Sequence, residues 1–394
     1  MIIIVSTTNG IFLNMKSKTI FTAFLLTILF SCSSGPDEGA IIAKVDITSP
    51  VSVSLFDYVD RVELIQLENT PEAMVSGGDY AISDDAFYIL GQKNQNIYSF
   101  STNGILRSRV NRAGRGNGEY TMSDDIVFCQ QDSSVLILNP MGLIYKYSIP
   151  EGYRFLSMTE INGNLRSVHN IWPLDRGNYL LFSMSEDNRV YFLGKDSDPK
   201  VLNSSHPRWI EFSPFCSSRY PFYEYGNEVR YFSGFDGTIY TYNSNQCTLV
   251  PYLIWDFGKN QISVQDVPEK DMTSNNREVI MSTYKEINKS KAAPVFNVCE
   301  TSRYILTDAY FRGEDYTVIY DKKKQSTQCF SKTIEGVLFC PSKSYKGDCF
   351  RYVSPDKLGL FVNESVLSDE YSKHIFEGIK DDSNMIIIKY YMKD

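Results

Sequence analysis

The dipeptide Ile97-Tyr98 is the first of a series that decides the fold of this 394-residue chain. Similar short apolar stretches ending in tyrosine recur at Ile144-Tyr145, Val190-Tyr191, Ile239-Tyr240, Ile319-Tyr320 and Lys389-Tyr390. The first four tyrosines are 47, 46 and 49 residues apart, and the last two gaps are 80 and 70 residues long. A repeat of this period predicts copies of one supersecondary unit that stack on their neighbours.

Two further strands are expected upstream of each tyrosine. In the first repeat, Tyr80-Ala81-Ile82 and Phe87-Tyr88-Ile89-Leu90 flank a polar turn, and in the last repeat a turn at Pro355-Asp356 is expected before Leu358 to Phe361. Short strands rich in Tyr, Ile, Val and Phe, separated by Asp, Asn and Gly, form antiparallel meanders. Six such meanders around an axis bury each other's faces, so the sequence predicts an all-β, six-bladed β-propeller of four-stranded antiparallel blades.

Two kinds of segment lie outside the regular repeat: a strand that closes the ring and two inserts in the long gaps. Closure of the ring needs one more strand, and the stretch from Val62 to Leu67 is expected to pair with the C-terminal strand from Met385 to Tyr391. The two long gaps predict short helical inserts at 271–289 and 366–379, which either pack against a propeller face or cover the central pocket. A β-sandwich followed by a second β domain is the alternative fold.

The N-terminus carries the pattern of an export signal. Lys16 and Lys18 precede an apolar run that is too short to span a bilayer, and Met15 is the expected start. The run ends in Leu29-Phe30-Ser31-Cys32, which resembles the lipobox of bacterial lipoproteins, so lipid is expected on Cys32. The predicted domains are a signal peptide at 1–31, the lipidated Cys and a flexible tether at 32–45, and the propeller at 46–394.

Composition and cysteine content narrow the function classes. A formal charge of −8 without a basic stripe argues against nucleic acid as a partner. The seven cysteines after Cys32 form no CxxC pair and lie apart from the three histidines, so neither a metal nor a cofactor is expected. One disulfide is expected within the only cysteine cluster, which contains Cys329, Cys340 and Cys349.

Several stretches in the expected order carry a family resemblance. These are Glu63 to Thr70, Gly114 to Tyr120, Pro251-Tyr252 with Trp255 to Gly258, and the Ile-rich C-terminal strand. Together they resemble the six-bladed β-propeller lipoproteins of Bacteroidota, which are related to TolB-like and NHL-type propellers. The resemblance implies an outer-membrane lipoprotein that faces the cell surface or the periplasm, and it implies no reaction.

The glycine-rich stretch from Gly114 to Tyr120 supplies the candidate site residues. It lacks the Lys-Ser/Thr ending of a phosphate loop and is expected to join one blade to the next. Such loops can line the axial face of a propeller, so Arg115, Glu119 and Tyr120 are the predicted ligand-binding residues. No residue is predicted to be catalytic, because the chain has no nucleophile elbow and too few histidines for a metal-dependent lyase.

Three function classes remain open on the sequence. A binding propeller for a glycan, a peptide or an envelope protein is favoured over an enzyme, and exposed aromatic side chains on an open axial face would support it. A carboxylate-dependent hydrolase or lyase acting on glycans is the alternative, which an apolar-aromatic pocket with one perturbed carboxylate would favour. A structural subunit would show a large apolar patch on the blade sides.

Overall fold

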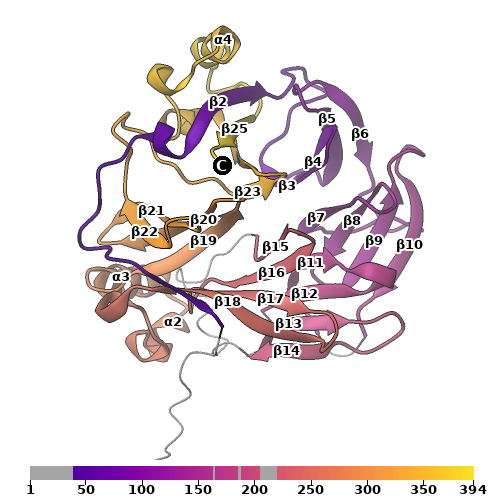
Figure 1. Ribbon diagram of the computed structural model, residues 1–394. Coiled ribbons are helices and arrows are strands. Elements are labelled where there is room, and N and C mark those ends of the chain that lie inside the picture. The colour runs from indigo at the N-terminus through magenta and orange to yellow at the C-terminus, as the bar shows by residue number, and fades with distance from the viewer. Residues whose placement is uncertain (1–38, 163–164, 185–187, 205–219) are drawn as a thin grey trace, which may run out of the picture. The chain divides into compact units, whose positions relative to one another are not determined.

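The structure, a computed structural model, describes residues 39–162, 165–184, 188–204 and 220–394. Residues 41–394 form one compact unit in which six antiparallel sheets surround a central axis (Figure 1). The sequence prediction of a six-bladed β-propeller is therefore confirmed, and the two-domain β-sandwich alternative is excluded. The predicted signal peptide, the lipobox and Cys32 lie outside the described residues.

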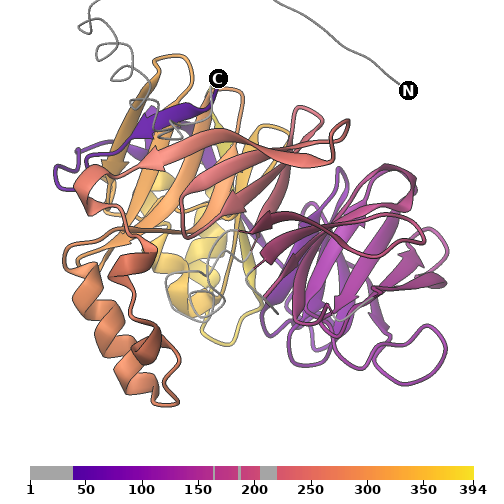
Figure 2. The same ribbon diagram turned by 90° about the horizontal axis from the view of Figure 1, so that it is seen from below.

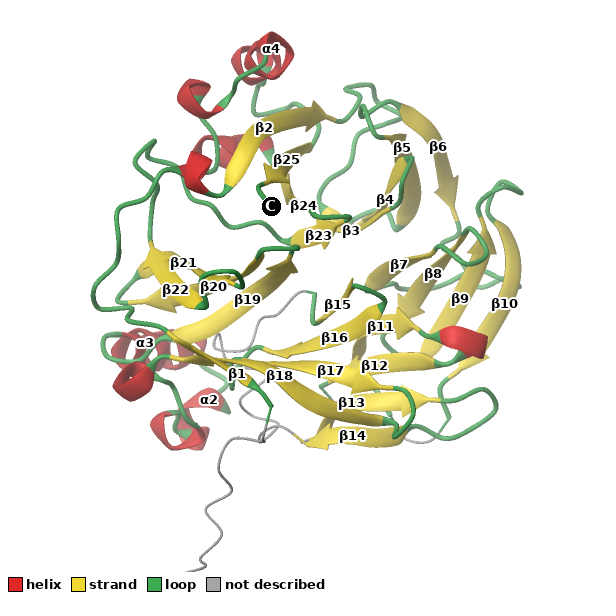
Figure 3. Cartoon of the chain, viewed as in Figure 1, coloured by secondary structure: helices red, strands yellow, loops and turns green. Residues whose placement is uncertain are grey.

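Each blade is a meander whose first strand lies nearest the axis (Figures 1 and 3). The strands of blades 1 to 3 are β3 (Gly78–Ile82), β4 (Ala86–Gly91), β5 (Asn96–Ser101), β6 (Leu106–Asn111); β7 (Asp125–Cys129), β8 (Ser134–Asn139), β9 (Leu143–Ser148), β10 (Arg154–Glu160); and β11 (Val168–Pro173), β12 (Tyr179–Ser183), β13 (Asn188–Leu193), β14 (Lys200–Ser204). Those of blades 4 to 6 are β15 (Phe222–Tyr225), β16 (Glu228–Ser233), β17 (Thr238–Asn243), β18 (Thr248–Asp256); β19 (Ala293–Glu300), β20 (Tyr304–Phe311), β21 (Glu314–Asp321), β22 (Ser326–Phe330); and β23 (Lys343–Tyr345), β24 (Asp348–Val353), β25 (Ile386–Met392).

Burial falls from the middle of a blade to its rim. All six residues of β4 and all six of β8 are buried, because neighbouring blades cover both faces of these second strands. In the outermost strand β6, exposed residues alternate with half-buried ones, as expected where only one face meets a neighbour. The repeat tyrosines occupy the third strands, where Tyr98 and Tyr390 are almost completely buried.

The ring closes through the N-terminal strand that the sequence predicted. β2 (Val59–Gln66) pairs antiparallel with β25, with Leu64 opposite Ile388, and becomes the outermost strand of blade 6. A further strand, β1 (Ile41–Lys44), pairs in parallel with the outer strand β18 of blade 4. The propeller unit thus begins before the predicted tether boundary at residue 45, because Ala43 is buried against blade 4.

Both predicted helical inserts are present, and both pack against blades. The helices are α2 (Glu269–Met272) and α3 (Arg277–Asn288) between blades 4 and 5, and α4 (Glu370–Gly378) between β24 and β25. The ring of Tyr284 in α3 stacks on Tyr310 at 5.6 Å, and the hydroxyl of Ser372 in α4 accepts a hydrogen bond from the Leu64 N–H at 3.0 Å. Figure 2 shows α2 and α3 on one face of the ring.

Short 3₁₀ helices supplement these elements, and one of them corrects a prediction. They cover Leu55–Asp57, Asp175–Gly177, Gly258–Asn260, Val264–Asp266, Pro355–Leu360 and Glu364–Val366. The expected strand from Leu358 to Phe361 is therefore wrong: Pro355 begins a helical turn, as proline readily does, and the second strand of blade 6 is β24, after a turn at Gly347. None of the helices in the described ranges is long and apolar enough to cross a membrane.

The disulfide predicted among Cys329, Cys340 and Cys349 is also wrong, because all three thiols are free. Cys329 lies in the apolar cluster between blades 4 and 5, whereas Cys340 and Cys349 belong to the cluster between blades 5 and 6. The Cys349 thiol instead contacts the thiol of Cys299, which is also buried and free. Cys329 is therefore separated from the other two cysteines by a blade, whereas Cys340 and Cys349 share one cluster without a bond between them.

Candidate functional site

A pocket of about 110 Å³ lies on the propeller axis. Its lining comes from β3, β7, β11 and β23 and from the start of β15, so the first strands of five blades contribute to it. Blade 5 contacts one of the lining residues: the Glu300 N–H at the end of β19 donates to the hydroxyl of Ser344 at 3.3 Å. We call this site the axial pocket.

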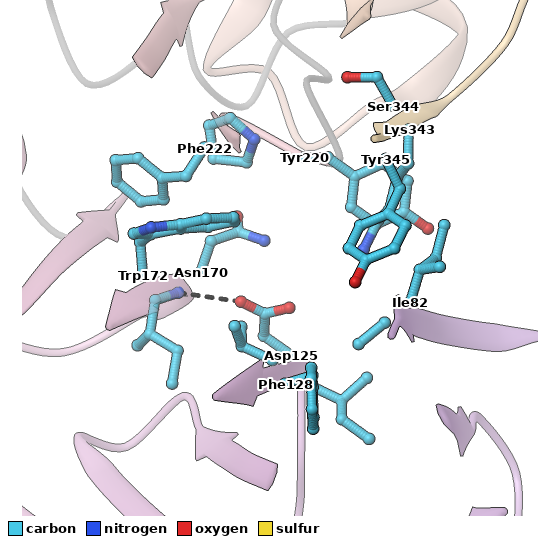
Figure 4. A pocket seen from close by; sticks show the side chains of 15 residues that line it. Ile82, Asp125, Phe128, Asn170, Trp172, Tyr220, Phe222, Lys343, Ser344 and Tyr345 are labelled. Carbon is cyan, nitrogen blue, oxygen red and sulfur yellow. Dashed lines mark hydrogen bonds between the residues drawn. The ribbon is translucent and has the colours of Figure 1, made fainter. Parts of the chain in front are cut away.

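Aromatic side chains form much of its wall. Trp172 and Phe222 lie on one side, Tyr220 and Tyr345 lie on the other, and the carboxyl group of Asp125 lies between them (Figure 4). Flat apolar faces combined with a few polar groups are typical of pockets that hold small ligands.

Four polar residues occupy equivalent positions in consecutive blades. In blade 1, Ile89 pairs with the repeat tyrosine Tyr98, and the next residue, Leu90, pairs with Asp79. In blades 6, 2 and 3 as well, the residue that follows the partner of the repeat tyrosine pairs with a polar residue of the first strand. We call these residues the polar arc, and in blades 6, 1, 2 and 3 they are Lys343, Asp79, Asp125 and Asn170.

Within the polar arc, Asp79 and Asp125 form a buried acid pair. Their relative exposures are 6% and 4%, and their carboxyl groups are in hydrogen-bond contact. One oxygen of Asp125 accepts the Ile171 N–H at 2.9 Å. Burial, and then the charge and hydrogen bond of Asp79, raise the pKa of Asp125 well above its ordinary value, while the charge of Lys343 acts in the opposite direction.

Lys343 lies on the Asp79 side of this acid pair. Its ammonium nitrogen is 3.7 Å from Oδ1 of Asp79, and that oxygen also accepts the Tyr80 N–H at 2.7 Å. The same ammonium group lies 3.9 Å from the ring centre of Tyr220 and 4.7 Å from that of Tyr80. Rings at this range attract a cation, so Lys343 is held as a charged group at the pocket wall.

The predicted binding residues Arg115, Glu119 and Tyr120 do not line the axial pocket. They lie in the connection from β6 to β7, where Glu119 accepts the Gly116 N–H at 2.8 Å. Gly118, at φ 73°, lies so close to Phe155 of the outer strand β10 that a Cβ there would be 2.4 Å from the ring. The loop is therefore fixed near the rim of blade 2, and its role in binding stays a prediction.

Tyr120 differs from the other two loop residues because its side chain is completely buried. It packs against Tyr145 and Tyr147, and its hydroxyl donates to the Gln95 carbonyl at 2.6 Å. The side chains of Arg115 and Glu119 are exposed. A tyrosine in this environment stabilises the contact between blades 1 and 2 and has no face available for a ligand.

This difference predicts separate outcomes for two substitutions. We expect Tyr120→Phe to lower the free energy of unfolding by about 1 kcal/mol, through loss of one buried hydrogen bond. Arg115→Ala should change it by less than about 0.5 kcal/mol, as for most exposed side chains. Denaturant unfolding measures both values. If Arg115→Ala alone abolishes the thermal shift given by a ligand, the loop is the binding site; an unchanged shift places binding elsewhere.

Within the described ranges, no three His, Cys, Asp or Glu side chains are placed to hold a metal ion together. His169 contacts the carboxylate of Asp124, which precedes Asp125 in the sequence, and His206 lies outside the described residues.

Comparisons with known proteins agree with this fold. A protein from Bacteroides fragilis NCTC 9343 that is thought to be exported is similar at 17% identity, with a TM-score of 0.68 over 90% of this chain and 100% of that one. A DUF4221 family member from Bacteroides vulgatus ATCC 8482 is similar at 8% identity, with a TM-score of 0.52 over 85% and 97%.

At the level of sequence, no curated protein matches the chain. The model of a family described as "Domain of unknown function (DUF4934)" matches residues 40–391, which is nearly the whole propeller. The chain therefore belongs to the DUF4934 family.

Proposed function

We propose that this chain is an envelope lipoprotein, tethered through Cys32 at the outer membrane, whose axial pocket binds one ring of a glycan. The observation that carries the proposal is the combination of aromatic faces with the polar arc in one pocket. The C–H faces of a sugar ring pack on aromatic side chains, and its hydroxyl groups need donors and acceptors. Asp125, Asn170, Lys343 and Ser344 supply such groups.

The size of the pocket limits how much of a ligand it encloses. A cavity of about 150 Å³ accommodates one benzene molecule, so the axial pocket, at about 110 Å³, encloses at most part of one sugar ring. Of the three partners that the sequence allows, a terminal sugar fits this pocket better than a folded protein or an extended peptide.

A structural subunit would show a large apolar patch on the blade sides. The outer strands instead expose single apolar side chains that are spread over three blades, including Leu156 and Met158 on β10, Val201 on β14 and Val250 on β18.

A thermal-unfolding screen of residues 33–394 against neutral sugars, peptides and divalent cations tests the proposal. A sugar at a hundred times its Kd should add about 2.7 kcal/mol to the free energy of unfolding. Trp172→Ala should abolish that shift, because it removes an aromatic face of the pocket. Tyr371→Ala, which removes an exposed aromatic ring from α4, should leave it intact. A shift from peptides alone, or one that survives Trp172→Ala, would contradict the proposal.

One observation favours catalysis as a second candidate. Asp125 is the perturbed carboxyl group in an aromatic pocket that the hydrolase alternative requires. Its contact with Asp79 is too close for the usual glycosidase arrangement, in which the two carboxyl groups lie about 5–9.5 Å apart. Catalysis through this acid pair would resemble the shared-proton dyads of aspartic proteases. Product release from oligosaccharides or peptides that stops in Asp125→Asn would establish this candidate.

A further inference from the structure

We propose that the acid pair of Asp79 and Asp125 binds a single proton and that this proton is on Asp125. The axial pocket therefore selects an uncharged, hydroxyl-bearing ring over a ring with an ammonium group. The part about the ligand rests on the proposed function. The part about the proton depends only on the acid pair and is tested separately.

The geometry of the acid pair is the first support. Two carboxyl groups in hydrogen-bond contact cannot both ionise without strong repulsion, and a shared proton turns this repulsion into a hydrogen bond. Both groups are more than nine-tenths buried, so the water that could screen two negative charges is largely excluded.

The surroundings place the negative charge on Asp79. Its Oδ1 accepts the Tyr80 N–H at 2.7 Å and lies 3.7 Å from the Lys343 ammonium nitrogen. Asp125 has one backbone donor, from Ile171 at 2.9 Å. A cation favours the ionised form of the nearer carboxyl group, so the more distant Asp125 takes the proton.

Other titratable groups near the acid pair leave this assignment in place. Among the described residues, Tyr345 and Tyr220 share the pocket, and burial and Asp84 raise the pKa of Tyr345 above its ordinary value. Asp124, the residue before β7, contacts His169. Burial is the largest cause of the raised pKa of Asp125, ahead of both the charge and the hydrogen bond of Asp79.

The protonation state of Asp125 decides whether the pocket attracts a positively charged ligand. An ionised Asp125 would attract an ammonium group and would offer only acceptors to a ligand. A protonated Asp125 has no charge to pair with a cation, and a buried ammonium group without a counter-ion is strongly disfavoured. Glucose and glucosamine share one ring and differ in this group, so they form a matched pair of probes.

The proton is tested first, without any ligand. In infrared difference spectra at pH 6, Asp125→Asn should remove one protonated-carboxyl band, and Asp132→Asn, in the exposed turn after β7, should remove none. Asp125→Asn mimics the protonated acid, so its thermal midpoint should rise relative to that of the native chain between pH 5 and pH 8. Asp79→Asn removes the counter-ion of Lys343 and should lower the midpoint across this range.

The sign of the pH effect follows from the raised pKa. The folded state keeps the Asp125 proton at pH values where the unfolded chain has lost it, so the contribution of Asp125 to stability is fully present at low pH and is lost as pH rises through the folded pKa. Absence of the band, or an Asp125→Asn midpoint that parallels the native one, overturns the proton assignment. A silent Asp79→Asn combined with a damaging Asp125→Asn would place the proton on Asp79 and overturn it as well.

Binding is then measured by calorimetry at pH 6. Glucose should bind at least tenfold more tightly than glucosamine, and Asp125→Asn should bind glucose within about threefold of the native chain, since an amide keeps a donor at this place. Tighter binding of glucosamine overturns the ligand assignment. If neither sugar nor any related saccharide binds, the proposed function fails, whereas the spectra and midpoints still decide where the proton is.

Discussion

Replacing Glu300 by alanine is expected to lower the free energy of unfolding by about 3–5 kcal/mol, the range observed when one partner of a buried ion pair is removed. The Glu300 side chain is completely buried at the contact of blades 4 and 5. Its two oxygens lie 2.7 Å from the Lys322 ammonium nitrogen and 3.6 Å from Nε of Arg230, whose side chain is only 4% exposed.

Two tyrosines add to this cluster. The hydroxyl groups of Tyr223 and Tyr252 each donate to a Glu300 oxygen at 3.0 Å. Burial, and then the charge of Glu300, raise the pKa of both phenols, so both remain donors at neutral pH. Without Glu300, the hydroxyl groups of Tyr223 and Tyr252 lose their acceptor and the Lys322 ammonium group loses a carboxylate at 2.7 Å, whereas Arg230 keeps Glu228 at 2.9 Å.

Denaturant unfolding at pH 7 measures this loss. Glu286→Ala is the matched control, because Glu286 forms an ion pair with Lys289 on α3 at 72% exposure. Exposed pairs contribute about 0–1 kcal/mol, so this control should remain close to the native chain. A Glu300→Ala variant that loses no more than its control would contradict the view that the cluster stabilises the contact between blades 4 and 5.

Leu64→Ala is expected to cost about 2–5 kcal/mol, as for other buried leucines cut back to alanine. Leu64 is fully buried in β2, opposite Ile388 of β25, and it belongs to the apolar cluster between blades 5 and 6. The substitution leaves a cavity at the seam where the two ends of the propeller meet.

Asp60→Ala is the control for this substitution, because Asp60 lies in the same strand with an exposed side chain. Its free energy of unfolding should stay within about 0.5 kcal/mol of the native value. Proteolysis of the folded chain gives a second measurement, since opening of the seam should expose β25 in Leu64→Ala. Equal protection in the two variants would show that closure does not depend on this contact.

The sequence predicted the blades because their signal is periodic. Tyr98, Tyr145 and the later repeat tyrosines occupy the same third strand in every blade, so their spacing counts the blades directly. The closing strand followed from the same count, which left the C-terminal blade one strand short. The boundary of β1 was missed because four residues after a polar stretch carry too little pattern to distinguish a strand from a tether.

The polar arc could have been found only in part. Asp79 and Asp125 each precede three apolar residues at the start of a first strand, and this similarity is visible in the sequence. Lys343 does not align with them on the sequence, because the sequence pattern predicts the second strand of blade 6 at Leu358 to Phe361. The burial of Tyr120 could not be predicted, because a tyrosine suits a binding surface and a buried blade contact equally well.

The seam between β2 and β25 also imposes an order on folding. Gln66 pairs with Ile386, so the contact joins residues 320 positions apart, among the most non-local that this chain can form. Contacts of such sequence separation form slowly, because a long loop must be closed before they are made. During synthesis β2 emerges long before β25, and it must remain without its partner strand until the last blade has arrived. For that interval the apolar side chains of β2, which are Val59, Val62, Leu64 and Ile65, are exposed, and chaperones that protect them should speed the recovery of folded protein.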